Sequence, residues 1–125
     1  MRSRENALRL KRFEADEKSR KVDGLEQMMR DFQHMATDLE RQVQAEEERT
    51  GIRDRAHFAY STFAKAATQR RDNLLASIAD LRVKLDDAIR QRDEARADLA
   101  SSEAAEPREQ GRNRRSSERA AVSLR

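Results

Sequence analysis

Apolar residues that recur in steps of three and four constrain this chain more than any other feature of its sequence. This spacing places apolar side chains on one narrow stripe of an α-helix, which is the heptad pattern of a coiled coil. The stripe occurs once in each half of the chain, so the sequence predicts two long helices that pack along one seam. The predicted seam residues are Val22, Leu25, Met29, Phe32, Ala36, Leu39 and Val43 in the first half, and Leu74, Ile78, Leu81, Leu85, Ala88, Ala95 and Leu99 in the second.

Both stripes extend toward the N-terminus of their helix, with charged interruptions. In the first half, two seam positions hold lysine, and Leu10 and Phe13 lie on a neighbouring row of the helix. This pattern predicts a slip of the register near Phe13. In the second half, Arg92 interrupts the seam. The extended stripes consist of Leu8, Lys11, Ala15 and Lys18 in the first half, and Tyr60, Ala64, Ala67 and Arg71 in the second.

The chain holds too few large apolar side chains to build a compact core. Leu, Ile, Val and Phe make up 21 of the 125 residues, and there is no Trp. Ala, Glu, Lys, Leu and Arg account for 69 residues, which is typical of long helices and coiled coils. The net charge is only +3, so self-repulsion is weak and disorder of the whole chain is disfavoured. The composition therefore predicts an all-α protein with a single seam.

Glycine and capping residues predict a turn in the middle of the chain. Gly51 suits the left-handed conformation that follows a helix C-terminus, and Ile52 then folds back onto the last helical turn. Asp54 is the first candidate N-cap of the second helix, with Ser61 or Thr62 as later alternatives. If Asp54 is the N-cap, the turn spans residues 51–55.

Pro107 and Gly111 predict the end of the second helix. The residues beyond them are mostly Arg, Ser, Ala and Glu without periodicity, which is typical of a disordered segment. The predicted organisation is a hairpin domain in residues 1–105 and a disordered Arg/Ser-rich tail in residues 106–125. The hairpin consists of helix 3–50, turn 51–55 and helix 56–104.

Net charge alternates in blocks along the chain and favours an antiparallel fold. Residues 1–21 carry a net charge of +4 and residues 22–50 carry −5, whereas residues 56–84 carry +3 and residues 85–105 carry −3. If the chain folds back at a five-residue turn, each block meets a block of opposite sign. A parallel arrangement would place like charges together, and so short a link could not build it. The predicted fold is therefore an elongated antiparallel two-helix coiled-coil hairpin.

The sequence offers no constellation of residues for catalysis. His34 and His57 are not in a metal-ligand spacing, and the three glycines lie too far apart for a phosphate loop. Carboxylates on a two-helix rod stay hydrated, without a pocket that shifts their pKa values. We therefore expect that the chain is not an enzyme and has no catalytic residue, cofactor, metal ion or small-molecule substrate.

Nucleic acid and a membrane span are both disfavoured. The excess of basic over acidic residues lies in the tail, at Arg112, Arg114 and Arg115, and the tail has no aromatic residue to stack on a base. No apolar run approaches the ~18–20 residues of a membrane span, and no signal-peptide core follows the polar N-terminus. The chain has no cysteine, which suits a reducing compartment. We expect a cytoplasmic protein.

Three of the five aromatic residues, Phe58, Tyr60 and Phe63, lie within six residues after the predicted turn. One interpretation is a hydrophobic plug that closes the base of the hairpin. The other is an exposed patch that binds a partner, because aromatic side chains are frequent anchors in interfaces. Phe58 and Phe63 cannot share one narrow seam with Tyr60, so at least one of them is expected to face solvent. The three are candidate partner-binding residues.

Two stretches of the chain resemble a known family. The first is Leu8-Arg9-Leu10-Lys11-Arg12-Phe13, followed by Asp16-Glu17-Lys18; the second comprises Gly51-Ile52, Ala56-His57-Phe58-Ala59-Tyr60, Ala64-Lys65-Ala66-Ala67 and Gln69-Arg70-Arg71-Asp72-Asn73-Leu74. On these residues the chain resembles a short subgroup of the FliJ family of flagellar export proteins. The tail departs from the helical, Glu-rich C-terminus of that family.

The resemblance implies a component of the bacterial flagellar type III export apparatus. FliJ proteins are cytoplasmic and form a hairpin similar to the central stalk of rotary ATPases. The implied partners are the export ATPase FliI, the export-gate protein FlhA and export chaperones, with peripheral membrane association through the apparatus at the flagellar base. The alternative function is an unrelated coiled-coil scaffold or tether.

The N-terminal bases supply a second set of candidate partner-binding residues. Their positive charge would steer association with an acidic pore in the ATPase ring. The competing interpretation is that they only pair with acidic residues of the second helix. The four bases are Arg4, Arg9, Lys11 and Arg12.

Overall fold

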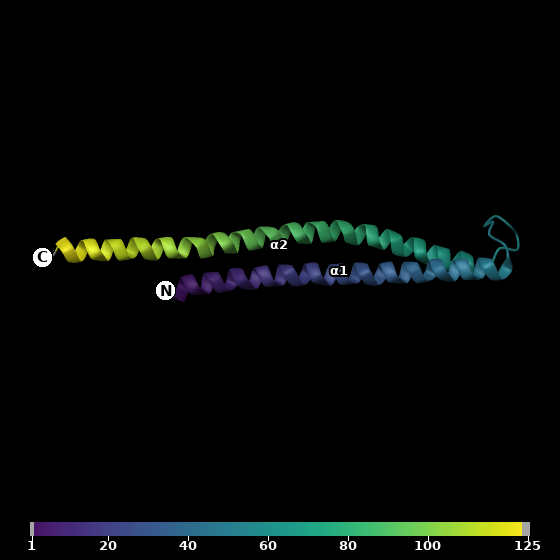
Figure 1. Cartoon of the computed structure of the whole chain (residues 1–125), viewed down its shortest axis with the longest axis horizontal. Coiled ribbons are helices and arrows are strands. Elements are labelled where there is room, and N and C mark those ends of the chain that lie inside the picture. The colour runs from purple at the N-terminus through teal and green to yellow at the C-terminus, as the bar shows by residue number, and fades with distance from the viewer. Residues whose placement is uncertain (1, 124–125) are drawn as a thin grey trace. The chain divides into compact units, whose positions relative to one another are not determined.

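The protein consists of two long α-helices joined by a linker (Figure 1). The computed structural model describes the backbone of residues 2–123 and the side chains of residues 2–105. α1 spans Arg2–Thr50 and α2 spans Thr62–Ser123, and the described backbone contains no strand. The predicted all-helical, two-helix class is confirmed, and this architecture is compatible with a helical hairpin.

Contacts divide the chain into two units. The terminal unit combines α1 up to Lys21 with α2 from Ala88 onward, and the linker unit comprises Val22–Asp87. The linker unit has two apolar clusters of buried residues. One cluster is Leu39, Val43, Tyr60, Ala64 and Ala67, with Ile52 and Leu74 packed against it; the other is Met29, Ile78 and Leu81, with Leu25, Phe32 and Leu85 packed against it.

Every predicted seam residue is at least half-buried, because the three-and-four spacing keeps these side chains on one stripe of each helix. Polar and charged side chains occupy most of the remaining surface. The buried seam residues are Val22, Met29, Ala36, Leu39, Val43, Ile78, Leu81 and Ala88, and the half-buried ones are Leu25, Phe32, Leu74, Leu85, Ala95 and Leu99.

Contacts within each unit follow one order: the earlier a residue lies in α1, the later its partner lies in the second half of the chain. In the terminal unit, Lys11 Nζ lies 3.5 Å from Asp98 Oδ1 and Lys18 Nζ donates to Gln91 Oε1 at 3.0 Å. In the linker unit, Arg71 Nη1 lies 4.0 Å from Glu40 Oε1 and Tyr60 Oη donates to Glu47 Oε1 at 2.7 Å.

The register of α1 does not slip near Phe13, so that prediction is wrong. Leu8 and Ala15 are buried, whereas Leu10 and Phe13 remain 57% and 59% exposed. The seam accommodates Lys11 because its aliphatic stem packs inward while its Nζ donates to Ser102 Oγ at 2.6 Å. A hydrogen-bonded lysine therefore replaces an apolar residue without a change of register.

The C-terminus of α1 lies where Gly51 predicts it. Gly51 has a φ of 73°, in the left-handed region, and its N–H donates to the carbonyl of Glu47 at 2.8 Å. Thr50 Oγ1 accepts a hydrogen bond from the Ile52 N–H at 3.3 Å, and the Ile52 side chain packs on the first apolar cluster. Ile52 thus folds back over the last turn of α1.

The linker is longer than the predicted turn, because α2 begins at Thr62 and not at residue 56. Asp54 Oδ1 accepts a hydrogen bond from the Ala56 N–H at 3.0 Å and so closes a turn inside the linker. Ser61 is the N-cap instead, since its Oγ accepts from the Ala64 N–H at 3.2 Å. The linker therefore spans residues 51–61.

The C-terminal end of α2 also differs from the prediction. The sequence predicts a helix that ends at residue 104 and a disordered tail in residues 106–125. α2 runs through Pro107 and Gly111 to Ser123. Proline has a φ compatible with a helix and removes one backbone hydrogen bond, while the surrounding Ala, Glu, Gln and Arg favour helix. Residues 124–125 lie outside the described residues.

Truncation of Leu81 tests the seam. Leu81 is buried beside Met29 and Ile78, so Leu81→Ala leaves a cavity and should lower the free energy of unfolding by about 2–4 kcal/mol. Denaturation followed by circular dichroism measures the change. Val83→Ala is the matched control, because Val83 is exposed on the same helix, and it should change stability by less than about 0.5 kcal/mol. An equal effect in both variants would contradict the seam.

Two glycine substitutions should change stability in opposite directions. A Cβ on Gly24 would meet no atom within 4 Å apart from the neighbouring residues and backbone of its own helix, so Gly24→Ala should stabilise α1 by about 0.5–1 kcal/mol. Gly51→Ala should destabilise the chain by about 1–2 kcal/mol, because φ is 73° there. Thermal and urea denaturation of both variants measure the sign, and a stabilising Gly51→Ala would contradict the left-handed cap.

Candidate functional site

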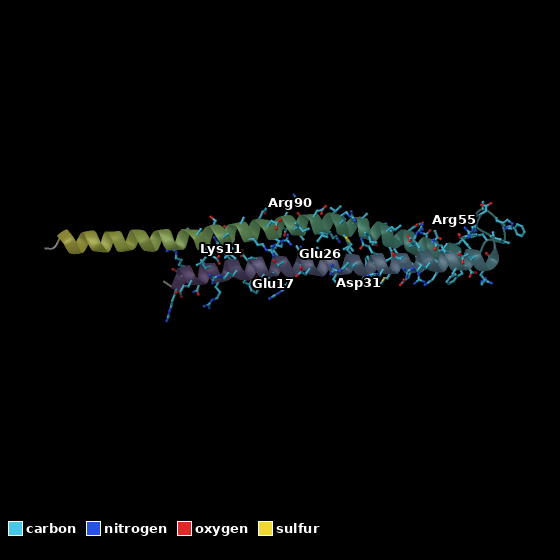
Figure 2. All side chains as sticks on the ribbon, in the orientation of Figure 1. Lys11, Glu17, Glu26, Asp31, Arg55 and Arg90 are labelled. Carbon is cyan, nitrogen blue, oxygen red and sulfur yellow. The ribbon has the colours of Figure 1, made fainter. Side chains whose placement is uncertain are left out.

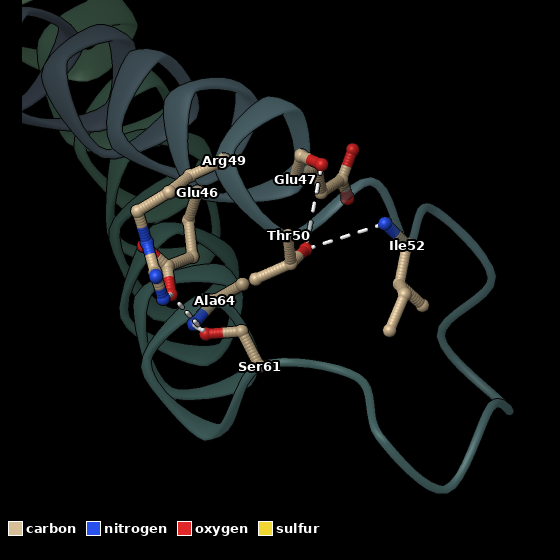
Figure 3. A network of polar contacts seen from close by, with 7 residues as sticks. All are labelled: Glu46, Glu47, Arg49, Thr50, Ile52, Ser61 and Ala64. Carbon is tan, nitrogen blue, oxygen red and sulfur yellow. Dashed lines mark hydrogen bonds and ion pairs between the residues drawn. The ribbon is translucent and has the colours of Figure 1, made fainter.

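Two adjacent glutamates in the last turn of α1 tie that helix to the end of the linker, and Figure 3 shows the contact of Glu46 with Ser61. Glu46 Oε1 accepts hydrogen bonds from Arg49 Nη2 at 2.6 Å and from Ser61 Oγ at 2.9 Å. Glu47 Oε1 accepts from Tyr60 Oη at 2.7 Å. The C-terminal end of the linker is therefore fixed by charge-assisted hydrogen bonds, which are stronger than neutral ones.

These contacts shift the ionisation of the groups involved. The hydrogen bond from Arg49, followed by the one from Ser61, lowers the pKa of Glu46 below 4.5. Donation to the Glu47 carboxylate, followed by burial of the phenol, raises the pKa of Tyr60 above 10.0. The network is thus intact when Glu46 is ionised and Tyr60 is protonated, which holds over the neutral range.

The structure separates the three candidate aromatic residues. Tyr60 is only 5% exposed and belongs to the first apolar cluster, so it acts as a plug. Phe58 is 97% exposed in the linker, and Phe63 is about half exposed at the start of α2. The two interpretations of this cluster therefore apply to different residues: Tyr60 closes the seam, and the two phenylalanines face solvent.

Turns within the linker hold Phe58 in place. The His57 N–H donates to the Asp54 carbonyl at 3.1 Å, and the Tyr60 N–H donates to the His57 carbonyl at 3.0 Å. The His57 ring stacks on Phe58 with centroids 4.7 Å apart and planes at 21°, while His57 Nδ1 accepts from the Ala59 N–H at 3.0 Å. An aromatic pair is thus presented on a hydrogen-bonded loop, which also carries the exposed Arg55 labelled in Figure 2.

The four N-terminal bases surround Leu8 in the terminal unit. Arg4 and Lys11 line one small hollow with Leu8, and Arg9 and Arg12 line a second. Lys11 contacts Asp98 and Ser102, and Arg12 Nε lies 3.2 Å from Glu103 Oε1. Arg9 and Arg12 are exposed. At least two of the bases therefore pair with α2, and these bases belong to a different unit from the aromatic residues.

Sequence reasoning missed a groove in the linker unit, of about 470 Å³. Its floor includes Leu39 and Leu74, and Met35, which is 50% exposed, lies on one side. The available signal was the pair Met28 and Met35, which lie one heptad apart and each directly precede a seam residue. The remaining lining residues are Asp38, Gln42, Arg70 and Asn73.

A buried hydroxyl was also missed. Thr68 is buried, and its Oγ1 has no hydrogen-bond partner. It was not part of the predicted seam because it lies one position after Ala67.

Within residues 2–105, no three His, Cys, Asp or Glu side chains are grouped so that they could hold a metal ion. In the same part of the chain, neither helix includes a segment of the length and apolarity required to cross a membrane. The surface features that remain are the aromatic linker, the basic N-terminal turns and the groove.

No protein-family model, curated protein or solved structure matches this chain. The resemblance to the FliJ family therefore depends on the sequence stretches themselves.

Glu46 should make stability depend on acid pH. A carboxyl whose pKa is lowered on folding contributes stability above its unfolded pKa, near 4.5, and this contribution is lost as pH falls through the lower folded value. Glu46→Gln should therefore be less stable than the native chain at neutral pH, and the two should converge in acid. Urea denaturation at a series of pH values measures the difference.

Glu48→Gln provides the control for this experiment. Glu48 is exposed in the same helical turn, so its replacement removes the same charge without breaking the linker network. The control should follow the pH dependence of the native chain. If Glu46→Gln also follows it, the contacts to Arg49 and Ser61 do not stabilise the fold.

Proposed function

We propose that the chain is an antiparallel two-helix coiled coil that acts as a stalk-like component of the flagellar type III export apparatus. In this role it binds and regulates the ring of the export ATPase FliI, and it couples the ring to the export-gate protein FlhA and to substrate chaperones. It works by binding other proteins in the cytoplasm, at the inner face of the membrane, and catalyses no reaction itself.

One observation carries the proposal. The stretch of residues 51–74 that resembles the FliJ family forms the linker and the first turns of α2. This stretch places the buried Tyr60 beside the exposed Phe58 and Phe63. A solvent-exposed phenylalanine costs hydration free energy, whereas the same residue anchors an interface when a partner covers it.

Two further observations support the antiparallel coiled coil. The heptad residues of both helices are buried or half-buried, and in each unit a residue earlier in α1 contacts a residue later in the second half of the chain. An eleven-residue linker suits neighbouring antiparallel helices, since a parallel arrangement needs a connection as long as the helix itself. The mixed charge of the two helices agrees with this pairing.

The N-terminal bases support a role for the terminal unit in docking. Arg9 and Arg12 are exposed near Leu8, and this local positive charge suits an acidic partner surface. Because Lys11 and Arg12 also contact α2, these two residues serve the fold as well.

Binding measurements with purified export proteins test the proposal. We expect the chain to bind the export ATPase and the cytoplasmic part of the gate protein, and to change the rate of ATP hydrolysis. Phe58→Ala should weaken binding to at least one of them by about tenfold or more, as for an interface anchor. Calorimetry gives the affinity, and circular dichroism shows that the variant stays helical.

Val83→Ala is the matched control, because it removes an exposed apolar side chain outside the linker. It should bind as the native chain does. If the native chain binds neither export protein, the proposed function is wrong; if Phe58→Ala lowers stability but not affinity, Phe58 belongs to the plug.

A further inference from the structure

The imidazole of His57 is bonded to the linker backbone in a way that only its neutral form allows. His57 Nδ1 accepts a hydrogen bond from the Ala59 N–H at 3.0 Å. A backbone N–H is always a donor, so Nδ1 must present a lone pair, and the ring proton must lie on Nε2. An imidazolium ion carries a proton on both nitrogens and would set one donor against another. The contact therefore exists only while His57 is neutral.

Phe58 lies between the two ends of this contact. The bond from the Ala59 N–H to His57 Nδ1 spans Phe58, and so does the bond from the Tyr60 N–H to the His57 carbonyl at 3.0 Å. The His57 ring also stacks on the Phe58 ring, with centroids 4.7 Å apart. Because Phe58 is 97% exposed, packing on the helices contributes little to its position. His57 is therefore the residue that holds Phe58 in place.

The other charged groups near the linker ordinarily keep their charge where an imidazole titrates. Carboxylate, guanidinium and ammonium groups stay ionised between about pH 5 and pH 8, whereas an imidazole changes its charge in this range. The hydrogen bonds from Arg49 and then Ser61 lower the pKa of Glu46 further, so the network at the C-terminal end of the linker stays intact. The charged groups are Arg53, Asp54 and Arg55 in the linker, Glu46 and Glu47 at the end of α1, and Lys65 in the first turn of α2.

We propose that His57 is a pH-sensitive latch that holds the Phe58 anchor in its binding position. The neutral imidazole accepts from Ala59, and the linker presents the phenyl ring on a closed turn. When His57 takes up a proton, the Ala59 N–H loses its acceptor and bonds to water instead. The turn opens, and Phe58 samples more conformations. A mobile anchor loses more conformational entropy when a partner covers it, so protonation weakens binding.

This regulation rests on the proposed role of Phe58 as an interface anchor, whereas the latch itself is a property of the linker. Two variants separate the acceptor of His57 from its ring. His57→Asn retains an acceptor, because the side-chain oxygen of asparagine bonds to the N–H two residues on, and it does not titrate. His57→Phe retains a ring that stacks on Phe58 but has no acceptor. His34, which is exposed on α1, is the only other histidine and serves as the internal reference.

Nitrogen-15 NMR of the full chain tests the latch without any partner. At about pH 8, His57 should show an unprotonated Nδ1 and a protonated Nε2, whereas the exposed His34 should populate both tautomers. Backbone order parameters of Phe58 and Ala59 should be high at about pH 8 and fall below about 0.6 at about pH 5. They should stay high in His57→Asn and low in His57→Phe at both pH values. The order parameter of Ile78 in α2 should not change, which excludes a loosening of the whole fold.

Three results would overturn the latch. A neutral His57 that carries its proton on Nδ1 cannot accept from Ala59. Native order parameters that are the same at both pH values would show that protonation does not free the turn. A loss of order in acid that His57→Asn shares with the native chain would assign the change to another group.

Binding measurements then test the consequence for function. The affinity of the export protein that engages Phe58 should fall about two- to tenfold between neutral and protonated His57, the range for one net hydrogen bond. His57→Asn should lack this decrease, and its comparison with the native chain at each pH cancels any titration of the partner. An equal decrease in both chains would overturn the control of binding by His57. If the native chain binds no export protein, the proposed function is wrong, and the NMR measurements still decide the latch.

Discussion

Burial of a single apolar stripe is the constraint on which the rest of this structure depends. Each helix exposes most of its side chains to water, and the buried side chains are mainly those of the heptad residues. At about 25 cal/mol per Å² of apolar area, a seam one residue wide provides far less stabilisation than a compact core. The chain therefore depends on each seam position, and substitutions such as lysine are tolerated only where a hydrogen bond compensates.

The terminal unit shows how such compensation works. Lys11 and Lys18 occupy seam positions, and each Nζ finds an oxygen on α2, at Ser102 and at Gln91. The lysine stems cover apolar surface while the ammonium groups stay paired. The result is a polar segment of the contact between α1 and α2 within the terminal unit.

The linker unit combines rigidity at the ends of the linker with exposure in its middle. Glu46 and Glu47 fix the C-terminal end through Ser61 and Tyr60, and the Gly51 N–H bonds to the Glu47 carbonyl at the other end, while Phe58 stays in solvent. A fixed loop loses little conformational entropy when a partner covers it, which favours binding by a preorganised anchor.

The sequence by itself determined the helical class, the two seams and the position of the cap at Gly51. These are local properties: heptad spacing sets which side of a helix is apolar, and only glycine adopts a positive φ without strain. Tertiary structure decided which residue caps α2 and which aromatic ring is buried, because local signals are the same for each alternative. Asp54 and Ser61 are both good N-caps, and Ser61 prevails because it also bonds to Glu46 of the other helix. Likewise, the aromatic character that Phe58 and Tyr60 share did not reveal their different roles, since contact with the first apolar cluster and with Glu47 selects which ring is buried.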